Sequence, residues 1–160
     1  MCECKCETVE LKVVKTYHDN GKLHQEYTED DQGRKHGTYR DWRDNEQLWS
    51  QCEYINGKLH GTYQYWHDNG QLWEQSEWVN DIRHGIIYAW EDDGSLKYIR
   101  QYDNGKTLVE VIFEQDNQRL KKPIIQICAP NHAKAGDGLI QVIKVLQEKG
   151  IKFKIAKIGE

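Results

Sequence analysis

Short runs of alternating polar and aromatic or aliphatic residues follow one another along most of this chain. Such alternation is typical of β-strands, because successive side chains in a strand point to opposite faces of the sheet. Asn-Gly or Asp-Gly pairs separate the runs, and these residues tolerate the positive φ angles that tight hairpin turns require. Turns at this spacing predict an antiparallel meander. The predicted turn tips are Asn20-Gly21, Asn56-Gly57, Asn69-Gly70, Asp93-Gly94 and Asn104-Gly105.

The chain also repeats itself with a shift of about 24 residues. The segment His18-Asp-Asn-Gly-Lys-Leu23 has counterparts, spaced by 25, 24 and 24 residues, that begin at Arg43, His67 and Glu91. A second motif runs from His36 to Trp42, from His60 to Trp66 and from His84 to Trp90. Self-similarity at a fixed period indicates a repeat architecture. We therefore divide the chain into an N-terminal segment with the first strand (1–17), four repeat units (18–108) and a C-terminal element (109–160).

Alternation predicts which residues share a face of the sheet. In the second unit, one face takes Leu48, Ser50, Cys52 and Tyr54, and the other takes Trp49, Gln51 and Glu53. Because large aromatic residues occur on both faces, we expect a mainly β fold, a single-layer twisted antiparallel meander. Equivalent residues two strands apart lie roughly 9.5 Å from each other, so the tryptophans form ladders. These ladders are either the core of a thin sheet or a binding surface, for which the candidates are Trp49, Trp73, Trp42, Trp66 and Trp90.

The segment Tyr54-Ile-Asn-Gly-Lys-Leu-His-Gly-Thr-Tyr-Gln-Tyr-Trp-His-Asp-Asn-Gly-Gln-Leu72 resembles the MORN-repeat variant of bacterial antitoxin-like proteins and of families in large DNA viruses. The resemblance covers residues 18–108. It implies a rod or trough of β-hairpins that serves as a scaffold or protein-binding surface. The sequence departs from the pattern in two places: Glu46 replaces the turn Gly of the second unit, and the first unit carries the polar insertion 29–33.

The pattern changes after Leu108. Residues 109–114 and 123–129 are predicted strands, and residues 138–149 follow the apolar spacing of a helix. We expect Leu139, Ile140, Ile143 and Leu146 on the inner face of that helix, Asp137 as its N-cap and Gly150 as its C-terminal stop. Residues 151–158 alternate as a further strand. Together these elements predict a small β-α-β cap with a right-handed crossover.

This cap is similar to the first half of a glutaredoxin, in which a strand, a Pro-containing loop and a helix follow one another. Redox chemistry requires a low-pKa thiol at the start of the helix. The loop at 130–136 contains no Cys, and Cys128 lies in the preceding predicted strand, where we expect it to be buried. The cap therefore lacks the active-site cysteines and is predicted to be a docking or capping element.

The composition fits a thin sheet better than a thick globule, because only 38% of the residues are hydrophobic while there are six Trp and nine Tyr. Residues 18–108 carry 10 Lys and Arg against 17 Asp and Glu, a net charge of −7. Residues 109–160 carry 9 against 6, a net of +3. Acidic repeats are poor partners for nucleic acid. Opposite charges at the two ends favour self-association of copies through the acidic repeats and the basic C-terminal element.

The five cysteines are an odd number, and no apolar signal segment precedes them, which favours free thiols in a reducing, intracellular compartment. No run approaches the length of a transmembrane helix. Cys2, Cys4 and Cys6 could hold zinc or copper if a partner completed the site, form disulfides between chains or carry an acyl group. An ordinary terminal tail without a metal is the default expectation.

No motif predicts an enzyme. The His and Asp residues recur at repeat distance instead of converging in one cluster, as a catalytic site requires. We therefore expect a protein without a cofactor that binds protein partners. Two hypotheses remain open at this stage. The first is an interaction scaffold or structural component of an assembly such as a virion, and the second is an antitoxin-like regulatory binder that masks one partner protein.

Overall fold

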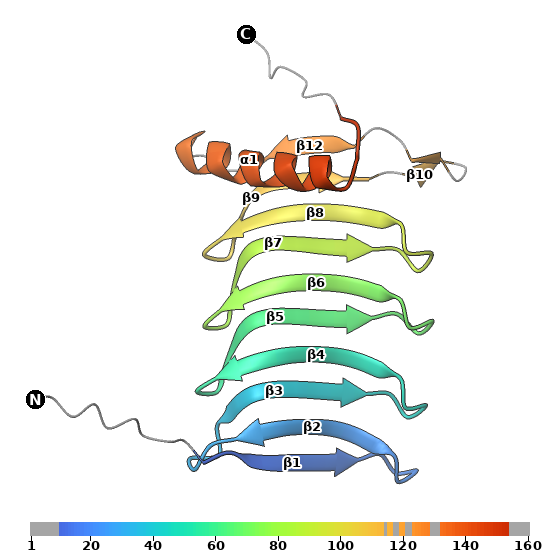
Figure 1. The fold of residues 1–160 in the computed structure, drawn as a ribbon, viewed down its shortest axis with the longest axis vertical. Helices are drawn as coiled ribbons and strands as arrows, with labels where there is room; N and C mark the ends of the chain where they lie inside the picture. The colour runs from blue at the N-terminus through green and yellow to red at the C-terminus, as the bar shows by residue number, and fades with distance from the viewer. Residues whose placement is uncertain (1–9, 114, 117–118, 121–122, 129–131, 154–160) are drawn as a thin grey trace, which may run out of the picture.

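The computed structural model describes residues 10–113, 115–116, 119–120, 123–128 and 132–153. The hairpins stack on one another, and each of the first eight strands pairs antiparallel with the next (Figure 1). The strands are β1 (Lys12–Tyr17), β2 (Leu23–Glu29), β3 (Lys35–Trp42), β4 (Leu48–Ile55), β5 (Lys58–Trp66), β6 (Leu72–Val79), β7 (Ile82–Trp90), β8 (Leu96–Asp103) and β9 (Lys106–Ile112). The predicted mainly β meander is confirmed, and β1 is the strand expected before the first repeat unit.

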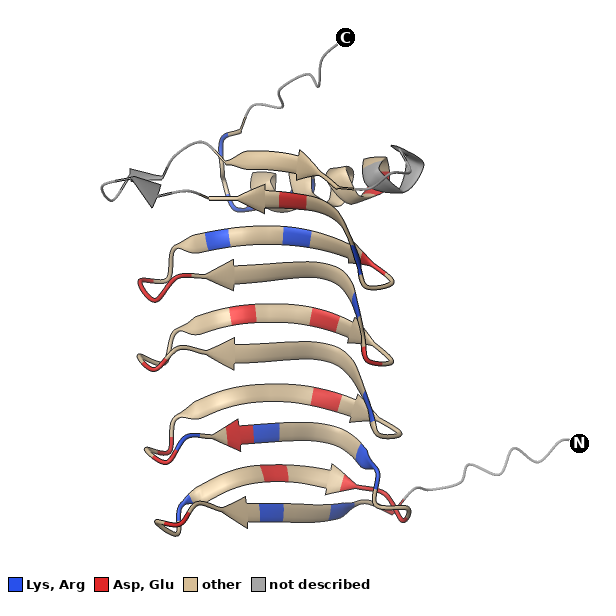
Figure 2. Cartoon of the chain, turned by 180° about the vertical axis from the view of Figure 1, so that it is seen from behind, with Lys and Arg blue, Asp and Glu red and all other residues tan. Residues whose placement is uncertain are grey.

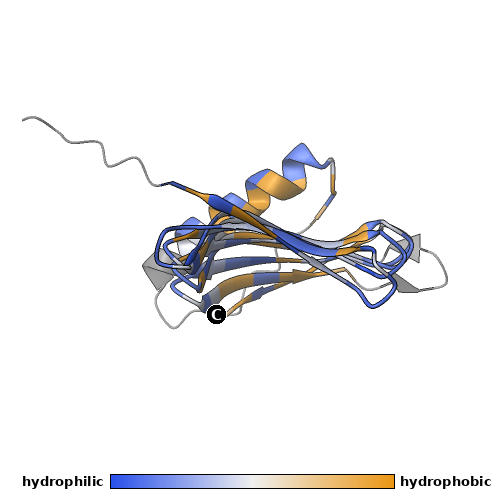
Figure 3. Ribbon diagram, turned by 90° about the horizontal axis from the view of Figure 1, so that it is seen from below, coloured by the Kyte–Doolittle hydropathy of each residue, from blue (hydrophilic) through white to orange (hydrophobic). Residues whose placement is uncertain are grey.

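Beyond β9 the chain forms the short pair β10 (Gln115–Asp116) and β11 (Arg119–Leu120). Next comes β12 (Ile124–Ile127), which pairs antiparallel with β9 as the tenth strand of the main sheet. The helix α1 (His132–Glu148) then crosses β8 and β9 on one side of the sheet, as the view along the stack shows (Figure 3). The sheet is therefore covered at its C-terminal end only.

The hairpin turns form two columns, one along each edge of the stack (Figure 1). Three turns of one column have positive φ at both central residues, as type I′ hairpins require: Asn56-Gly57, Asn80-Asp81 and Asn104-Gly105. In the longer turns of the other column a single residue has positive φ, at Gly21, Glu46, Gly70 and Gly94. Glu46 thus adopts the conformation of the Gly that it replaces. The turn at Asn80-Asp81 was not predicted, because an Asp stands where the other two have Gly.

We call the side of the sheet that α1 covers the helix face and the opposite side the groove face. On the helix face, Ile99, Val109 and Val111 are fully buried beneath Val142 and Leu146 of α1. Burying each such side chain contributes about 1.5–3 kcal/mol. This cluster is the thickest part of the core, and it closes one end of the repeat array.

Away from α1 the middle of the helix face is polar. One row of cross-strand neighbours runs over β2 to β6 through Glu26, Arg40, Gln51, Gln64 and Gln75. Within it Arg40 Nε donates to Gln51 Oε1 at 2.8 Å, and Gln64 Nε2 donates to Gln75 Oε1 at 3.0 Å. The polar groups of these side chains are hydrogen-bonded to one another. This part of the sheet therefore needs no second layer of secondary structure to cover it.

A second, aromatic cluster lies on the groove face. Tyr39, Cys52 and Leu59 are buried there among side chains of the same face, which are Tyr27, Tyr54, Tyr63 and Trp78. Lys35 lies over this cluster, with its Nζ 4.1 Å from the centre of the Tyr39 ring. No element of the described chain packs on the groove face. The residues of this cluster are buried because large aromatic rings on the same face pack against one another laterally. The expected single layer is thereby confirmed.

Several details of the predicted cap are wrong. The helix begins at His132, so Asp137 lies inside it and is no N-cap. Ile140 is 53% exposed, because the helix turns Val142, Val145 and Leu146 toward the sheet instead.

Two further expectations for the cap concern its ends. Cys128 is exposed and not buried, since β12 is the edge strand of the sheet. Residues 151–153 form no strand, although Ile151 and Phe153 pack on the core, and the rest of the predicted strand lies outside the described residues. The stop at Gly150 is confirmed by its φ of 68° and by the bond from Ile151 N to Leu146 O at 2.8 Å.

Candidate functional site

Two tryptophans owe their position to β-bulges. In the pairing of β3 with β4, Asp41 lies opposite Ser50 and Trp42 opposite Leu48, so Trp49 is an extra residue. Trp73 is the extra residue at the equivalent place between β5 and β6. A bulge leaves one residue unpaired and redirects its side chain. Both tryptophans are turned by this device onto the groove face.

Tyr65 lies between the two tryptophans. Its ring centre is 6.3 Å from that of Trp49 and 6.1 Å from that of Trp73, with the planes inclined by 62° and 58°. Tyr65 also stacks on Tyr63 at 4.2 Å. The exposed fractions of Trp49 and Trp73 are 40% and 46%, high for residues of this size. The tryptophans therefore stand as two walls, and the tyrosines form the floor between them.

The space between these walls is a groove of about 350 Å³, which we call the aromatic groove. Its lining residues are Trp49, Tyr63, Tyr65, Trp73, Glu74 and Arg83. Inside the groove, Glu74 accepts hydrogen bonds from Tyr98 Oη at 2.9 Å and from Arg83 Nη2 at 3.2 Å. Burial, followed by the Glu74 carboxylate, raises the pKa of Tyr98 to about 12, so this phenol stays protonated and donates. The polar end of the groove is thereby held in a fixed arrangement.

A second depression adjoins the groove at the turns, and we call it the turn pocket. It has a volume of about 500 Å³, and its lining residues are Arg43, Trp66, His67, Asp68, Asn69, Trp73 and Asp92. Trp73 separates it from the aromatic groove and lies 5.9 Å from the His67 ring. Arg43 pairs with Asp68 at 2.8 Å, and the Asp68 side chain is still 87% exposed. Acidic residues follow this edge of the stack from turn to turn (Figure 2).

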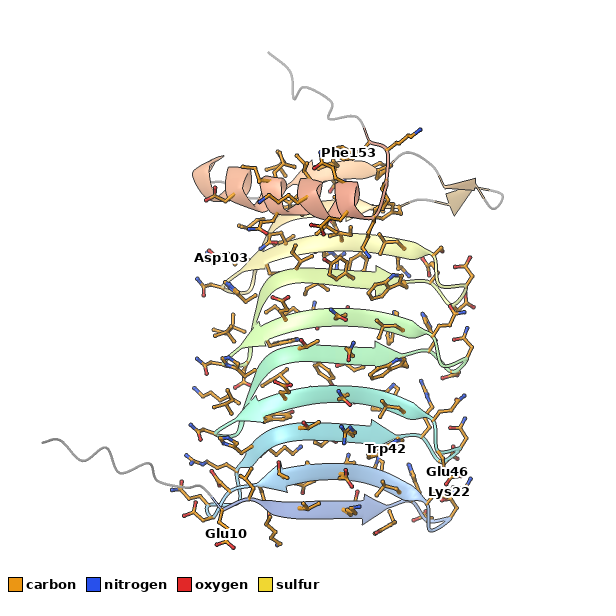
Figure 4. All side chains as sticks on the ribbon, viewed as in Figure 1. Glu10, Lys22, Trp42, Glu46, Asp103 and Phe153 are labelled. Atoms are coloured by element: carbon orange, nitrogen blue, oxygen red, sulfur yellow. The ribbon has the colours of Figure 1, made fainter. Side chains whose placement is uncertain are left out.

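Hydrogen bonds between neighbouring repeats hold these turns in register. The first residue of each of the first three long turns donates to the carbonyl of the Trp one repeat later: His18 to Trp42 at 2.8 Å, Arg43 to Trp66 at 3.1 Å and His67 to Trp90 at 3.0 Å. Lys22 and Glu46, on neighbouring turns, form an ion pair at 3.1 Å (Figure 4). These interactions hold the turns that line the pocket in a fixed position. The recurring His residues at the long turns have a structural role.

The five predicted binding residues do not form one surface. Trp42, Trp66 and Trp90 follow directly on groove-face residues, so alternation places them on the helix face. Each lies opposite a leucine there, in the pairs Trp42–Leu48, Trp66–Leu72 and Trp90–Leu96. Trp90 stacks on Tyr88, which packs against the core under α1. The structure brings together only Trp49 and Trp73.

Sequence reasoning missed the other groove residues, namely Tyr65, Glu74 and Arg83. The signal for Tyr65 was present, because the equivalent positions in the neighbouring repeats hold Asp41 and Ala89. A large ring at this one position fills the space between the two tryptophans. Arg83 gave no such signal, since its contact with Glu74 depends on the pairing of β6 with β7.

A site for a metal ion is not formed by the described residues, in which no three His, Cys, Asp or Glu side chains cluster suitably. Cys2, Cys4 and Cys6 lie outside the described residues, so their predicted roles stay predictions. Within the same part of the chain, α1 is too short and too polar to cross a membrane.

Comparison with protein families identifies the repeats. The sequence profile described as the MORN repeat variant matches residues 12–28, 35–56, 59–80 and 83–104, which together make up more than half of the chain. The chain belongs to the MORN repeat variant family. Each matched stretch of this MORN protein starts in one strand and ends in the next strand or one residue after it. MORN repeats are typically involved in interactions with proteins or membranes.

Comparison of the MORN protein with curated proteins gives no sequence match. Among solved structures, S. aureus TarM in complex with Fondaparinux, alpha-GlcNAc-glycerol and UDP is similar at 10% identity and a TM-score of 0.38, over 86% of this chain and 24% of TarM. The GtfA/B complex bound to UDP and GlcNAc is similar at 9% identity and a TM-score of 0.30, over 89% and 27%. The MORN protein spans about a quarter of these chains, and such low scores carry no argument about function.

Proposed function

We propose that this MORN protein is a non-enzymatic scaffold that binds a protein partner in the aromatic groove. The observation that carries the proposal is the exposure of Trp49 and Trp73 beside Tyr65 on a face that no element of the described chain covers. Aromatic residues are enriched among those that contribute most to binding energy at interfaces. Two tryptophans turned toward solvent lower solubility, and exposed apolar patches of this kind mark interaction sites.

The arrangement of charges argues against catalysis in this groove. Both carboxylate oxygens of Glu74 accept hydrogen bonds, one from Arg83 and one from Tyr98, so this group has a structural role in the groove. The tyrosines of the repeats are poor proton donors, because burial raises the pKa of Tyr63 and, to about 12, that of Tyr54. The groove combines aromatic walls with polar groups held in place by hydrogen bonds, which suits the recognition of a binding partner.

The two ends of the sheet support an assembly role. β1 is an edge strand whose side chains Val13 and Tyr17 are 58% and 61% exposed. An edge of this kind presents unpaired backbone groups to another strand. A scaffold that binds one partner on its face and another molecule at its edge is compatible with incorporation into a large intracellular assembly, such as a virion.

The test is affinity purification of the tagged chain from its native source under reducing conditions, in parallel with Trp49→Ala and Trp73→Ala. A protein that the wild type retains and that both variants lose supports the proposal. Retention by all three chains would contradict it.

Sizing of the retained material separates the two roles: many copies in a large particle indicate a scaffold, whereas a one-to-one complex indicates an antitoxin-like binder. Ile55→Ala, an exposed residue of the opposite face, is the matched control.

A further inference from the structure

We propose that the occupant of the aromatic groove is a proline-rich, basic segment of the partner protein in the polyproline II conformation. This inference rests on the proposed function and specifies the chemistry of the partner. Four features of the groove carry it. They are the pairing of the strands beneath it, its aromatic lining, the spacing of its two tryptophans and the charges of the adjoining turn pocket.

The strands beneath the groove offer no open edge to a ligand. Trp49, Tyr65 and Trp73 belong to β4, β5 and β6, which are central strands paired on both sides. A partner in this groove cannot add a strand, so recognition must come from side chains. A polyproline II segment fits this condition, since it makes no internal hydrogen bonds and keeps its backbone in contact with water.

The lining of the groove favours proline over an amphipathic helix. A helix docks with aliphatic residues into a broad hydrophobic channel. This groove instead has two indole walls inclined by about 60° to a tyrosine floor, and aliphatic side chains are absent from its lining. Aromatic-lined grooves of this kind receive proline-rich segments, whose rigidity lowers the entropy lost on binding.

The spacing of the walls matches the period of such a segment. Trp49 and Trp73 occupy equivalent positions two strands apart, a distance of about 9.6 Å along the stack. Polyproline II has three residues per turn and rises about 3.1 Å per residue, so its side chains repeat every 9.3 Å or so. A segment that runs along the stack therefore presents residues i and i+3 to successive repeats. One proline fits over Tyr65 between the walls, and the other lies beyond Trp73 on the next repeat.

The turn pocket supplies the charge complementarity. It shares Trp73 with the groove and exposes the carboxylates of Asp68 and Asp92. The repeats around it carry the net charge of −7 counted over residues 18–108. An arginine or lysine next to the inserted proline reaches past Trp73 into this pocket, where its cation meets the carboxylate of Asp92 and shares that of Asp68 with Arg43. An acidic segment would be repelled at the same place.

Selection from a display library of random short peptides by the full-length chain tests the inference. We expect enriched peptides with prolines three residues apart and a neighbouring Arg or Lys. The affinity of such a peptide should fall about tenfold or more in Trp49→Ala and Trp73→Ala. It should fall a few-fold in Asp92→Asn, with a weaker dependence on salt, and stay unchanged in Ile55→Ala. Circular dichroism verifies that each variant is folded.

Enrichment without proline, no enrichment at all, or proline-rich peptides that bind the tryptophan variants as well as the wild type would overturn the inference. The proposed function fails by a different result. If the native partner still depends on Trp49 and Trp73 while the selected peptides lack proline, the groove is a binding site for another kind of segment. If the partner ignores both tryptophans, the proposed function itself is wrong.

Discussion

The ring of Trp49 lies 6.3 Å from that of Tyr65 on the groove face, although strict alternation from Ser50 assigns Trp49 to the opposite face. The bulge between β3 and β4 accounts for the difference, because Trp49 has no partner in β3 and its side chain is turned across the strand. The same bulge in the next repeat turns Trp73. Through these two bulges the tryptophan side chains form the two walls of the aromatic groove.

The groove tryptophans contribute little to folding, whereas the core under α1 is essential for it. We predict that Trp49→Ala or Trp73→Ala lowers the free energy of unfolding by about 1 kcal/mol or less, because much of each side chain is exposed. Ile99→Ala should cost about 2–5 kcal/mol, since Ile99 is fully buried. Urea denaturation followed by circular dichroism measures both. Equal losses at the two sites would show that the groove is part of the core.

Two glycines of α1 differ in their surroundings and form a matched pair. Gly136 is exposed, and an added methyl group would meet nothing within 4 Å. Gly136→Ala should therefore stabilise the protein by about 0.5–1 kcal/mol. At Gly138 the methyl group would lie 3.2 Å from Gln101 Cγ and 3.4 Å from Leu108 Cβ. Gly138→Ala should lose this gain, because α1 must move away from the sheet.

Thermal denaturation of the two glycine variants provides the measurement. The prediction is an increase in Tm for Gly136→Ala and none for Gly138→Ala. Equal increases in both variants would contradict the close packing of α1 on β8 and β9.

Cys52 should resist alkylation in the folded protein. Burial raises the pKa of its thiol to about 11, so very little reactive thiolate exists near neutral pH. Cys128 is exposed, and its thiol should react first even though partial burial also raises its pKa. Brief treatment with iodoacetamide at pH 8, followed by peptide mass spectrometry, compares the two. Modification of Cys52 before Cys128 would mean that the groove-face core opens more readily than the structure indicates.

Asp30 should make stability depend on pH. Burial alone would raise the pKa of its carboxyl, but hydrogen bonds from the backbone and side chain of Arg34 and from Gln32 N outweigh burial and lower that pKa. A lowered pKa in the folded state stabilises the protein above the ordinary Asp value near 3.9, and this contribution is lost as the pH falls through the lowered value. Asp30→Asn should therefore be less stable than the wild type at pH 7.

The difference between Asp30→Asn and the wild type should shrink as the pH falls below about 4, where the wild-type carboxyl becomes protonated. Urea denaturation of both chains at pH 7 and at pH 3 measures it. A difference that is the same at both values would show that the Arg34 interaction with the carboxylate contributes nothing.

The repeat fold could be predicted from the sequence because its information is local. Asn-Gly pairs determine the turns at Asn56 and Asn104, and the recurring His-Gly motifs determine the register. Bulges are not visible in this pattern, since the extra residue looks like any member of an alternating run. The prediction for Trp49 was wrong for that reason.

The cap was harder to predict than the repeats, because it is not repeated and tertiary contacts decide its geometry. Apolar spacing indicated a helix near residues 138–149 but could not tell that Val142 and Val145, and not Ile140, face the sheet. The exposure of Cys128 likewise follows from the position of β12 at the edge of the sheet, which the local sequence does not specify.

Fluorine NMR of the chain labelled with fluorotryptophan, with and without the captured partner, tests the central claim most directly. The six tryptophans give separate resonances, which single Trp→Phe substitutions assign. Partner binding in the aromatic groove should shift the resonances of Trp49 and Trp73 and leave that of Trp42, which lines neither the groove nor the turn pocket, in place. A shift of Trp42 without shifts of Trp49 and Trp73 would place the partner on the helix face and contradict the account.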